Sequence, residues 1–141
     1  MKAVKVDLGA DLEIIEIHVF ADWHIGDSLC NLKAITNIVA DVEQKRNAYI
    51  ILNGDLLNNA RTTSVSDTYS EKVPPMDQIN MLVGLLTPIK DRILFADTGN
   101  HEFRTYKQDG IDMMALVMAQ LGLIDRYGSE GGIIFLRIGL S

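Results

Sequence analysis

Residues 48–59 read AYIILNGDLLNN, an apolar run that leads directly into a polar turn. The run Ala48–Asn53 is apolar on both faces, which is typical of a central strand in a parallel sheet. Gly54 then allows the chain to turn sharply, and Asp55 and two asparagines follow. Because open α/β sheets form their sites at the carboxyl ends of strands, this stretch predicts both the fold class and the position of a site.

The same alternation of apolar runs and helix-period segments extends along the chain and predicts an α/β fold, with a mostly parallel sheet flanked by helices. We expect its strands at Leu12–Phe20, Ala48–Asn53, Arg92–Ala96 and Gly132–Ile138. The segment Lys2–Leu8 is expected to pair with the first of these as an edge strand.

Apolar residues at helical spacing predict helices over Ser28–Lys45, Met76–Lys90 and Ile111–Leu121. Asp27 or Ser28 would cap the first of them. The polar stretch Asn58–Pro75 predicts a long surface loop, which is a common form for a functional lid or a disordered connection.

Composition narrows the class of protein. The chain has 141 residues, of which 48% are hydrophobic, and a formal net charge of −6. This length predicts one domain, 1–141, with a real core. Apolar runs fall short of the roughly 18 residues of a membrane span, so we expect no membrane association. The acidic balance disfavours broad nucleic-acid binding without excluding a local basic patch. With one cysteine, Cys30, and no secretory segment, we expect a cytoplasmic protein.

Polar residues gather in three clusters, each just past an expected strand: Asp22-Trp23-His24, residues 53–59, and Thr98-Gly99-Asn100-His101-Glu102. Residues i and i+2 of an extended chain face the same way, so Asp22 and His24 could contact one ion. Carboxylates, an imidazole and an amide form a donor set that suits Mn, Fe or Zn. Asp55, between the other clusters, could bridge two ions. Each cluster alone is common, but the three in this order predict a metal site.

The order Asp-x-His, Gly-Asp-x-x-Asn and Gly-Asn-His-Glu resembles that of the calcineurin-like metallophosphoesterases, most clearly over residues 13–102. The resemblance implies that Asp22 and His24 bind a first metal ion, that Asp55 bridges two ions and that Asn100 binds the second. His101 would stand near the leaving-group oxygen as a general acid or an orienting donor. The family reaction is an in-line attack on phosphorus, without a covalent enzyme intermediate.

The resemblance is incomplete in one respect. The family carries a later lone histidine and a Gly-His-x-His block, whereas this chain has no histidine after His101. The second ion would keep only Asp55 and Asn100, so we expect it to be held weakly.

The family fold is a four-layer sandwich of two sheets flanked by helices, and this chain supplies about half of it. We interpret the chain as the N-terminal half of such an enzyme, whether a truncated product, a cloned fragment or one piece that needs a partner. One sheet face would then be uncovered and available for self-association or for the missing C-terminal half.

Further candidates lie beside the clusters. Arg61 and Arg104 could bind a substrate phosphate, although the phosphatase branch of the family places its arginine where this chain has Asn59. Glu102 could orient the side chain of His101 without itself binding metal or substrate. Equally, it could be a solvated glutamate at the start of a helix.

Three functional hypotheses remain open. The first is a dinuclear metal-dependent phosphatase or phosphodiesterase acting on a phosphomonoester, a phosphodiester, a nucleotide or a nucleic-acid end. The second is a catalytically silent protein-binding module that keeps the same fold. The third is an aspartyl-phosphate phosphatase with Asp22 as nucleophile, which is disfavoured because His24 stands where a second carboxylate is expected.

Overall fold

The computed structural model describes residues 1–59 and 73–139. Its strands are β1 (Lys2–Asp7), β2 (Glu16–Phe20), β3 (Ala48–Asn53), β4 (Ile93–Asp97) and β5 (Gly132–Arg137). Its helices are α1 (Leu32–Gln44), α2 (Pro75–Leu86), α3 (Asn100–Asp109) and α4 (Met113–Gln120), with 3₁₀ segments η2 (Thr87–Arg92) and η3 (Ile124–Arg126). Within these described ranges, no helix is long and apolar enough to cross a membrane. Arg61 and most of the expected loop Asn58–Pro75 lie outside them.

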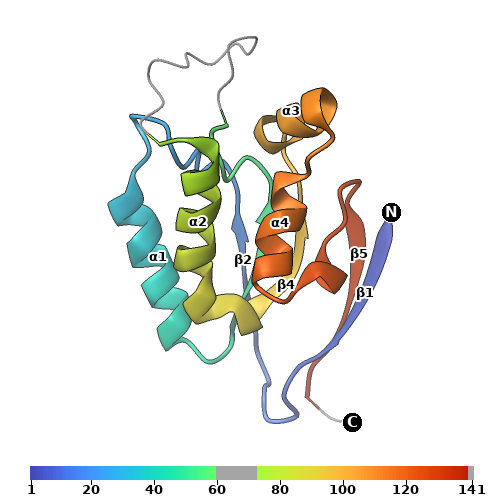
Figure 1. Cartoon of the computed structure of the whole chain (residues 1–141). Coiled ribbons are helices and arrows are strands. Elements are labelled where there is room, and N and C mark those ends of the chain that lie inside the picture. Colours follow the sequence, from blue (N-terminus) through green and yellow to red (C-terminus); the bar gives the residue numbers. More distant parts are fainter. Residues whose placement is uncertain (60–72, 140–141) are drawn as a thin grey trace.

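The strands form two parallel sheets. One has three strands in the order β2-β3-β4, and the other pairs β1 with β5. Helices α1, α2 and α4 pack on one face of the three-stranded sheet, and the β1–β5 pair packs on the other (Figure 1). The expected α/β fold, with parallel sheets flanked by helices, is therefore confirmed.

Strand β3 connects the two layers because it is apolar at consecutive positions. Ile50 and Leu52 are fully buried in the core under the helices. Tyr49 and Ile51 alternate to the opposite face, where they belong to a second core with Val4 of β1. Burial of each large aliphatic side chain contributes about 1.5–3 kcal/mol, so β3 is anchored from both sides.

The expectation that the N-terminal segment pairs with the next strand was wrong. β1 pairs instead with β5, in a register that runs from Lys2 opposite Gly132 to Asp7 opposite Arg137. A turn in which the amide of Leu12 donates to the carbonyl of Gly9 interrupts the chain after β1. The inward side chains of β1 then pack on the second core, in a different layer from β2.

The helix boundaries also differ from expectation. Helix α1 begins at Leu32, and its cap is Asn31, whose side chain accepts from the amide of Ala34 at 3.0 Å. Asp27, an expected cap, instead accepts from the amide of Leu29 at 2.7 Å within the loop. The helix starts late because the residues just before it form a local turn, in which the amide of Cys30 also donates to the carbonyl of Asp27 at 3.1 Å.

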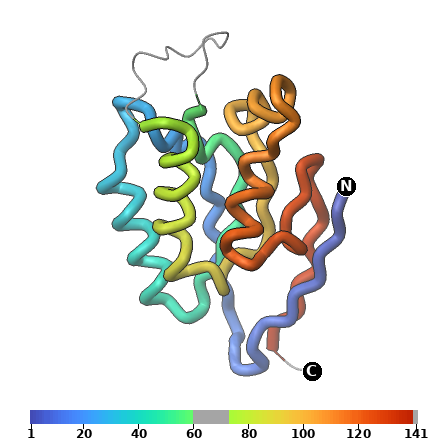
Figure 2. The backbone as a smooth tube through the Cα atoms, in the orientation of Figure 1, coloured from blue at the N-terminus to red at the C-terminus, as the bar shows by residue number. Residues whose placement is uncertain are grey.

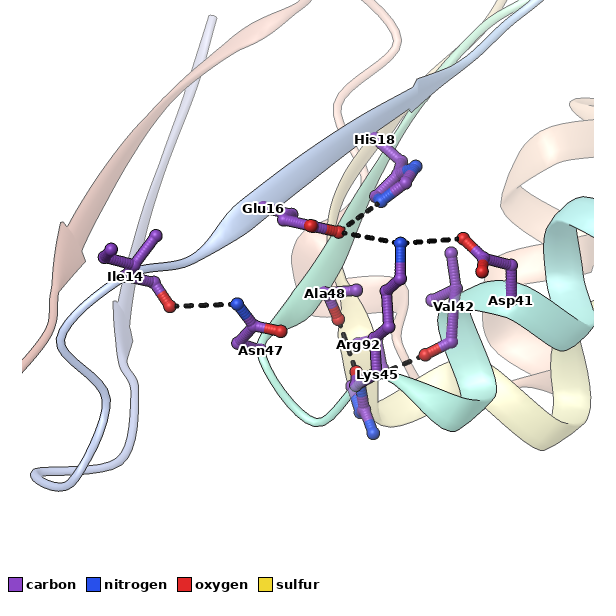
Figure 3. A network of polar contacts seen from close by, with 9 residues as sticks. All are labelled: Ile14, Glu16, His18, Asp41, Val42, Lys45, Asn47, Ala48 and Arg92. Carbon is purple, nitrogen blue, oxygen red and sulfur yellow. Dashed lines mark hydrogen bonds and ion pairs between the residues drawn. The ribbon is translucent and has the colours of Figure 1, made fainter.

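Polar contacts at the amino ends of the strands hold α1 against the sheet (Figure 3). Lys45 Nζ lies 3.5 Å from Glu16 Oε2 and 3.1 Å from Asp41 Oδ2, which joins the end of α1 to the start of β2. Arg92 donates to the carbonyl of Ala48 at 3.0 Å, at the start of β3. The same Glu16 oxygen lies 3.2 Å from His18 Nε2, so His18 has a partner far from the polar clusters.

Two strands present apolar side chains to solvent. Ile17 and Val19 of β2 are 44% and 60% exposed, and Ile133 and Phe135 of β5 are 49% and 54% exposed. The β1–β5 pair covers part of the second sheet face, so the expected uncovered face is smaller than a whole sheet and lies on β2 and on the outer side of β5.

Candidate metal centre

The three polar clusters lie at the same end of the molecule. The segments after β2 and β3 and the start of α3 come together at the carboxyl edge of the three-stranded sheet (Figure 2). Each segment follows a parallel strand, so the sheet itself brings together residues that are far apart in sequence.

Left-handed backbone marks these segments. Among the described residues, the non-glycine residues with positive φ are Asp22 (55°), His24 (47°), Asp55 (52°) and Asn59 (44°). Such a conformation costs roughly 1–2 kcal/mol per residue, and it persists only where the surroundings impose it. Three of the four are ligands expected from the sequence, so the strain coincides with the candidate site.

The loops after β2 and β3 are held together backbone to backbone. The amide of Asp22 donates to the carbonyl of Gly54 at 3.3 Å, and that of His24 donates to the carbonyl of Asp55 at 3.2 Å. Beyond them, the amide of Ile25 donates to the carbonyl of Leu56 at 2.9 Å. The pairing of β2 with β3 thus continues past the strands and sets the main chain of Asp22 and His24 beside that of Asp55.

The loop after β4 packs closely against the turn at Asp55, where Gly99 of this loop meets Gly54 of the loop after β3. A Cβ atom on Gly54 would lie 2.7 Å from the Gly99 main chain, and one on Gly99 would lie 2.2 Å from the Asp55 nitrogen. Neither contact is sterically allowed, so both positions require glycine. The close approach lets the amide of His101 donate to Asp55 Oδ1 at 2.9 Å.

A pocket of about 500 Å³ opens beside these loops. Its lining includes Asp22, His24, Cys30, Asn58 and His101. Asp22 Oδ1 lies 3.7 Å from His24 Nε2, and the imidazole rings of His24 and His101 meet edge to face with centroids 4.4 Å apart. The expected first-metal ligands and the expected catalytic histidine therefore share one pocket wall.

The ring of His101 is oriented by the loop after β3. His101 Nδ1 lies 2.6 Å from the carbonyl oxygen of Asn58, which can only accept, so Nδ1 carries the proton. Nε2 is then the nitrogen available to a substrate. A guanidinium nitrogen of Arg104 lies 3.4 Å from it, which places a positive charge directly beside this imidazole.

The remaining candidates are placed as follows. Asn100 is exposed at the first residue of α3. Glu102 is 1% exposed, and its carboxylate accepts backbone N–H bonds from Gly99, Asp55 and Leu57. The His101 ring, which the sequence suggested as the partner of Glu102, is instead held by Asn58.

Sequence reasoning missed the structural role of Asn59. Its side chain is fully buried and donates to the His101 carbonyl at 2.7 Å and to Thr105 Oγ1 at 2.9 Å. Its own amide donates to the side chain of Gln78 at 3.0 Å, which links the loop to α2. The paired asparagines 58 and 59 were the available signal, since asparagine tolerates left-handed backbone better than most residues.

Asp97, the last residue of β4, was also missed. Its Oδ1 is buried and accepts no hydrogen bond within the described part of the chain. Burial raises the pKa of this carboxyl, and the nearby charges of Glu102 and Asp55 raise it further. The folded state therefore disfavours the charged form of Asp97, beside the carboxylates of Glu102 and Asp55.

The candidate ligands have the chemistry that a divalent cation prefers. Two carboxylates and an imidazole lie on loops whose main chains are paired, and this hard to borderline set suits Mn, Fe or Zn. As the side chains lie, no three His, Cys, Asp or Glu residues among positions 1–59 and 73–139 stand close enough together to hold an ion. The convergence expected from the sequence thus holds for the main chain and not for a closed set of side-chain ligands.

The chain is similar to a known protein family over most of its length. The family model for calcineurin-like phosphoesterases matches residues 15–140, a range that contains all three clusters. No curated protein and no solved structure matches the chain. Members of this family act on phosphoester bonds and generally use two divalent metal ions. The match covers most of the sequence, and the chain therefore belongs to the calcineurin-like phosphoesterases.

Proposed function

We propose that this chain is the ligand-bearing part of a metal-dependent hydrolase that cleaves phosphomonoesters or phosphodiesters. The observation that carries the proposal is the backbone pairing of the loops that follow β2 and β3, closed from the third side by His101. It puts carboxylate, imidazole and amide donors from three distant segments at one sheet edge.

Asp22 and His24 are the residues that would hold the first divalent ion, Asp55 would be shared, and Asn100 would contribute to a weaker second position. When bound, Mn, Fe or Zn supplies Lewis-acid polarisation of the phosphoryl oxygens and lowers the pKa of a bound water. Asp55 is suited to the shared position because its main chain is joined to both neighbouring loops.

His101 is proposed as the residue that protonates or orients the leaving-group oxygen. Because Nδ1 donates to Asn58, a proton for the leaving group would have to come from Nε2 of the doubly protonated ring. Arg104, which lies beside this ring, is proposed to bind the anionic phosphoryl group. Arg61, which is not among the described residues, is proposed as a second phosphate-binding residue. Because Arg104 already lies next to Nε2, a bound phosphate would draw it away from the imidazole and free that nitrogen.

Hydrolysis of p-nitrophenyl phosphate and of its bis ester with added Mn²⁺ tests the proposal. Wild type and Asp91→Ala, a change of an exposed carboxylate on η2, are expected to show the same metal-dependent rate. Asp55→Ala should lower that rate at least about 100-fold, since several kcal/mol of charge stabilisation are removed. Equal rates for wild type and Asp55→Ala would refute the enzyme proposal for this chain.

Metal affinity gives a second test of the ligand assignment. Asp55→Asn should weaken Mn²⁺ binding more than Asn100→Ala, because it removes a charge from the shared position whereas the second change removes a neutral amide. Calorimetric titration that gave the reverse order would contradict the assignment of Asp55.

A second candidate function, a protein-binding module, is favoured by the exposed apolar side chains of β5. We propose that Ile133 and Phe135 lie in a surface for self-association, in a cytoplasmic protein for which nucleic acid is a possible but not a favoured partner. Sedimentation should show association at micromolar concentration in wild type and less in Phe135→Lys. A stable monomer over that range would contradict it.

A further inference from the structure

We propose that Glu102 is a positioning residue: its buried carboxylate fixes the main chain of Asp55, and thereby the direction of the Asp55 side chain toward the metal. The inference rests on the proposed function, in which Asp55 is a ligand. It differs from the role that the sequence suggested for Glu102, which was to orient the His101 ring.

The contacts of Glu102 span both sides of the turn at Asp55. Glu102 Oε2 accepts from the amide of Asp55 at 3.1 Å, and Oε1 accepts from that of Leu57 at 2.8 Å. Oε2 also accepts from the amide of Gly99 at 3.0 Å, in the loop after β4. One carboxylate thus joins two strand-end loops to the first turn of α3.

This clamp explains how Asp55 keeps an unfavourable backbone. A φ of 52° is left-handed backbone, which is unfavourable for an aspartate, so the turn needs several independent restraints. Glu102 restrains the amide of Asp55 itself and the amide two residues later. The amide of His101, on the same turn of α3, restrains the side chain through Oδ1.

Among residues 1–59 and 73–139, the partners of the Glu102 carboxylate are backbone dipoles. Its partners given above are backbone N–H groups, and it lies in the first turn of α3, where the helix dipole favours a negative charge. A buried carboxylate that accepts several N–H bonds is strongly held, because charge-assisted bonds are roughly twice as strong as neutral ones. These N–H bonds and the helix dipole therefore hold the carboxylate of Glu102 in place beside Asp55.

The variant Glu102→Gln removes hydrogen-bond acceptance by the side chain while keeping its size and shape. The amide has nearly the shape of the carboxylate, but its NH₂ group cannot accept from a backbone N–H. Whichever way the amide is turned, an N–H of Gly99, Asp55 or Leu57 loses its acceptor. Glu130→Gln, an exposed change of the same type, is one control. Ile89→Val, which removes one methyl group from the core under α2, is a second control that lowers stability without touching the loops.

Two measurements decide the proposal. In metal-free protein, amide hydrogen exchange read by NMR should show Asp55 and Leu57 protected in wild type and in both controls. At least one of them should exchange more than about tenfold faster in Glu102→Gln. Mn²⁺ affinity, from titration, should fall about 10–100-fold in Glu102→Gln and stay within twofold in the controls.

The outcomes separate this inference from the proposed function. If wild type binds no Mn²⁺, the proposed function fails, and the clamp is judged by amide exchange alone. If wild type binds Mn²⁺ and Glu102→Gln binds it equally well, the positioning role is refuted. Unprotected Asp55 and Leu57 amides in wild type refute it as well, and this measurement does not depend on the folding of any variant. An equal loss of affinity in Ile89→Val would show that stability, not positioning, is responsible.

Discussion

Replacement of Gly99 by alanine should disrupt the contact between the loops that follow β3 and β4. The new Cβ would lie 2.2 Å from both the main-chain nitrogen and Oδ1 of Asp55, whereas ordinary contacts begin at 3.4 Å. Gly99 has φ of −99° and ψ of −177°, values open to alanine, so the penalty is purely steric. The loops must separate by more than 1 Å to accept the methyl group.

That separation breaks two hydrogen bonds. The amide of Asp55 loses Glu102 at 3.1 Å, and Asp55 Oδ1 loses the amide of His101 at 2.9 Å. Each bond to a charged group is worth about 1.5–3 kcal/mol, and partial relaxation recovers some of it. We therefore expect Gly99→Ala to lower the free energy of unfolding by about 2–4 kcal/mol.

Urea unfolding followed by the fluorescence of Trp23, the single tryptophan, measures this change. The matched control is Gly84→Ala in the exposed interior of α2, where an added Cβ meets nothing within 4 Å. It should stabilise the protein by about 0.5–1 kcal/mol, because alanine is the better helix former. A Gly99→Ala variant within about 0.5 kcal/mol of wild type would refute the steric reasoning.

Two further predictions concern titratable groups near the site. Tyr127 donates its hydroxyl to both oxygens of Asp112, at 2.9 and 2.7 Å, so Tyr127→Phe should cost about 1.5–3 kcal/mol in urea unfolding at neutral pH. Burial, and then Asp112, raise the pKa of Tyr127. Its contribution is therefore complete below the unfolded pKa of about 10 and is lost as the pH rises above it. Melting temperatures above pH 10 should fall less in Tyr127→Phe than in wild type, and equal slopes would contradict this. Burial raises the pKa of Asp97, because the folded state favours the protonated carboxyl. The stability that this preference contributes is complete below the unfolded pKa of about 4, and it is lost as the pH rises through the folded pKa. Asp97→Asn should raise the stability at neutral pH, and a less stable variant in thermal melts would overturn that interpretation.

The sequence predicted those parts of the fold that depend on local pattern. The β3 stretch is recognisable because consecutive apolar residues end at a Gly-Asp turn, and its central, parallel position between β2 and β4 agrees with that signal. The three clusters were placed correctly at one sheet edge because parallel strands impose that geometry.

The remaining features depend on contacts between distant segments. The pairing of β1 with β5 joins Lys2 to Gly132, and nothing local distinguishes it from pairing with β2. Helix α3 was not expected because its ten residues are mostly polar; tertiary bonds from Glu102 and Asn59 anchor its first turn. The left-handed backbone of Asp55 is not visible in the sequence either, because Asp55 is restrained by bonds to the distant residues Glu102 and His101.

The most direct test of the central claim is a crystal structure of the protein grown with Mn²⁺, with anomalous differences measured at a wavelength where manganese scatters. The account predicts an anomalous peak at the carboxyl edge of the three-stranded sheet, with Asp22, His24 and Asp55 turned toward it and the paired loops unchanged. A peak at another place on the molecule, or an empty sheet edge in manganese-saturated crystals, would contradict it.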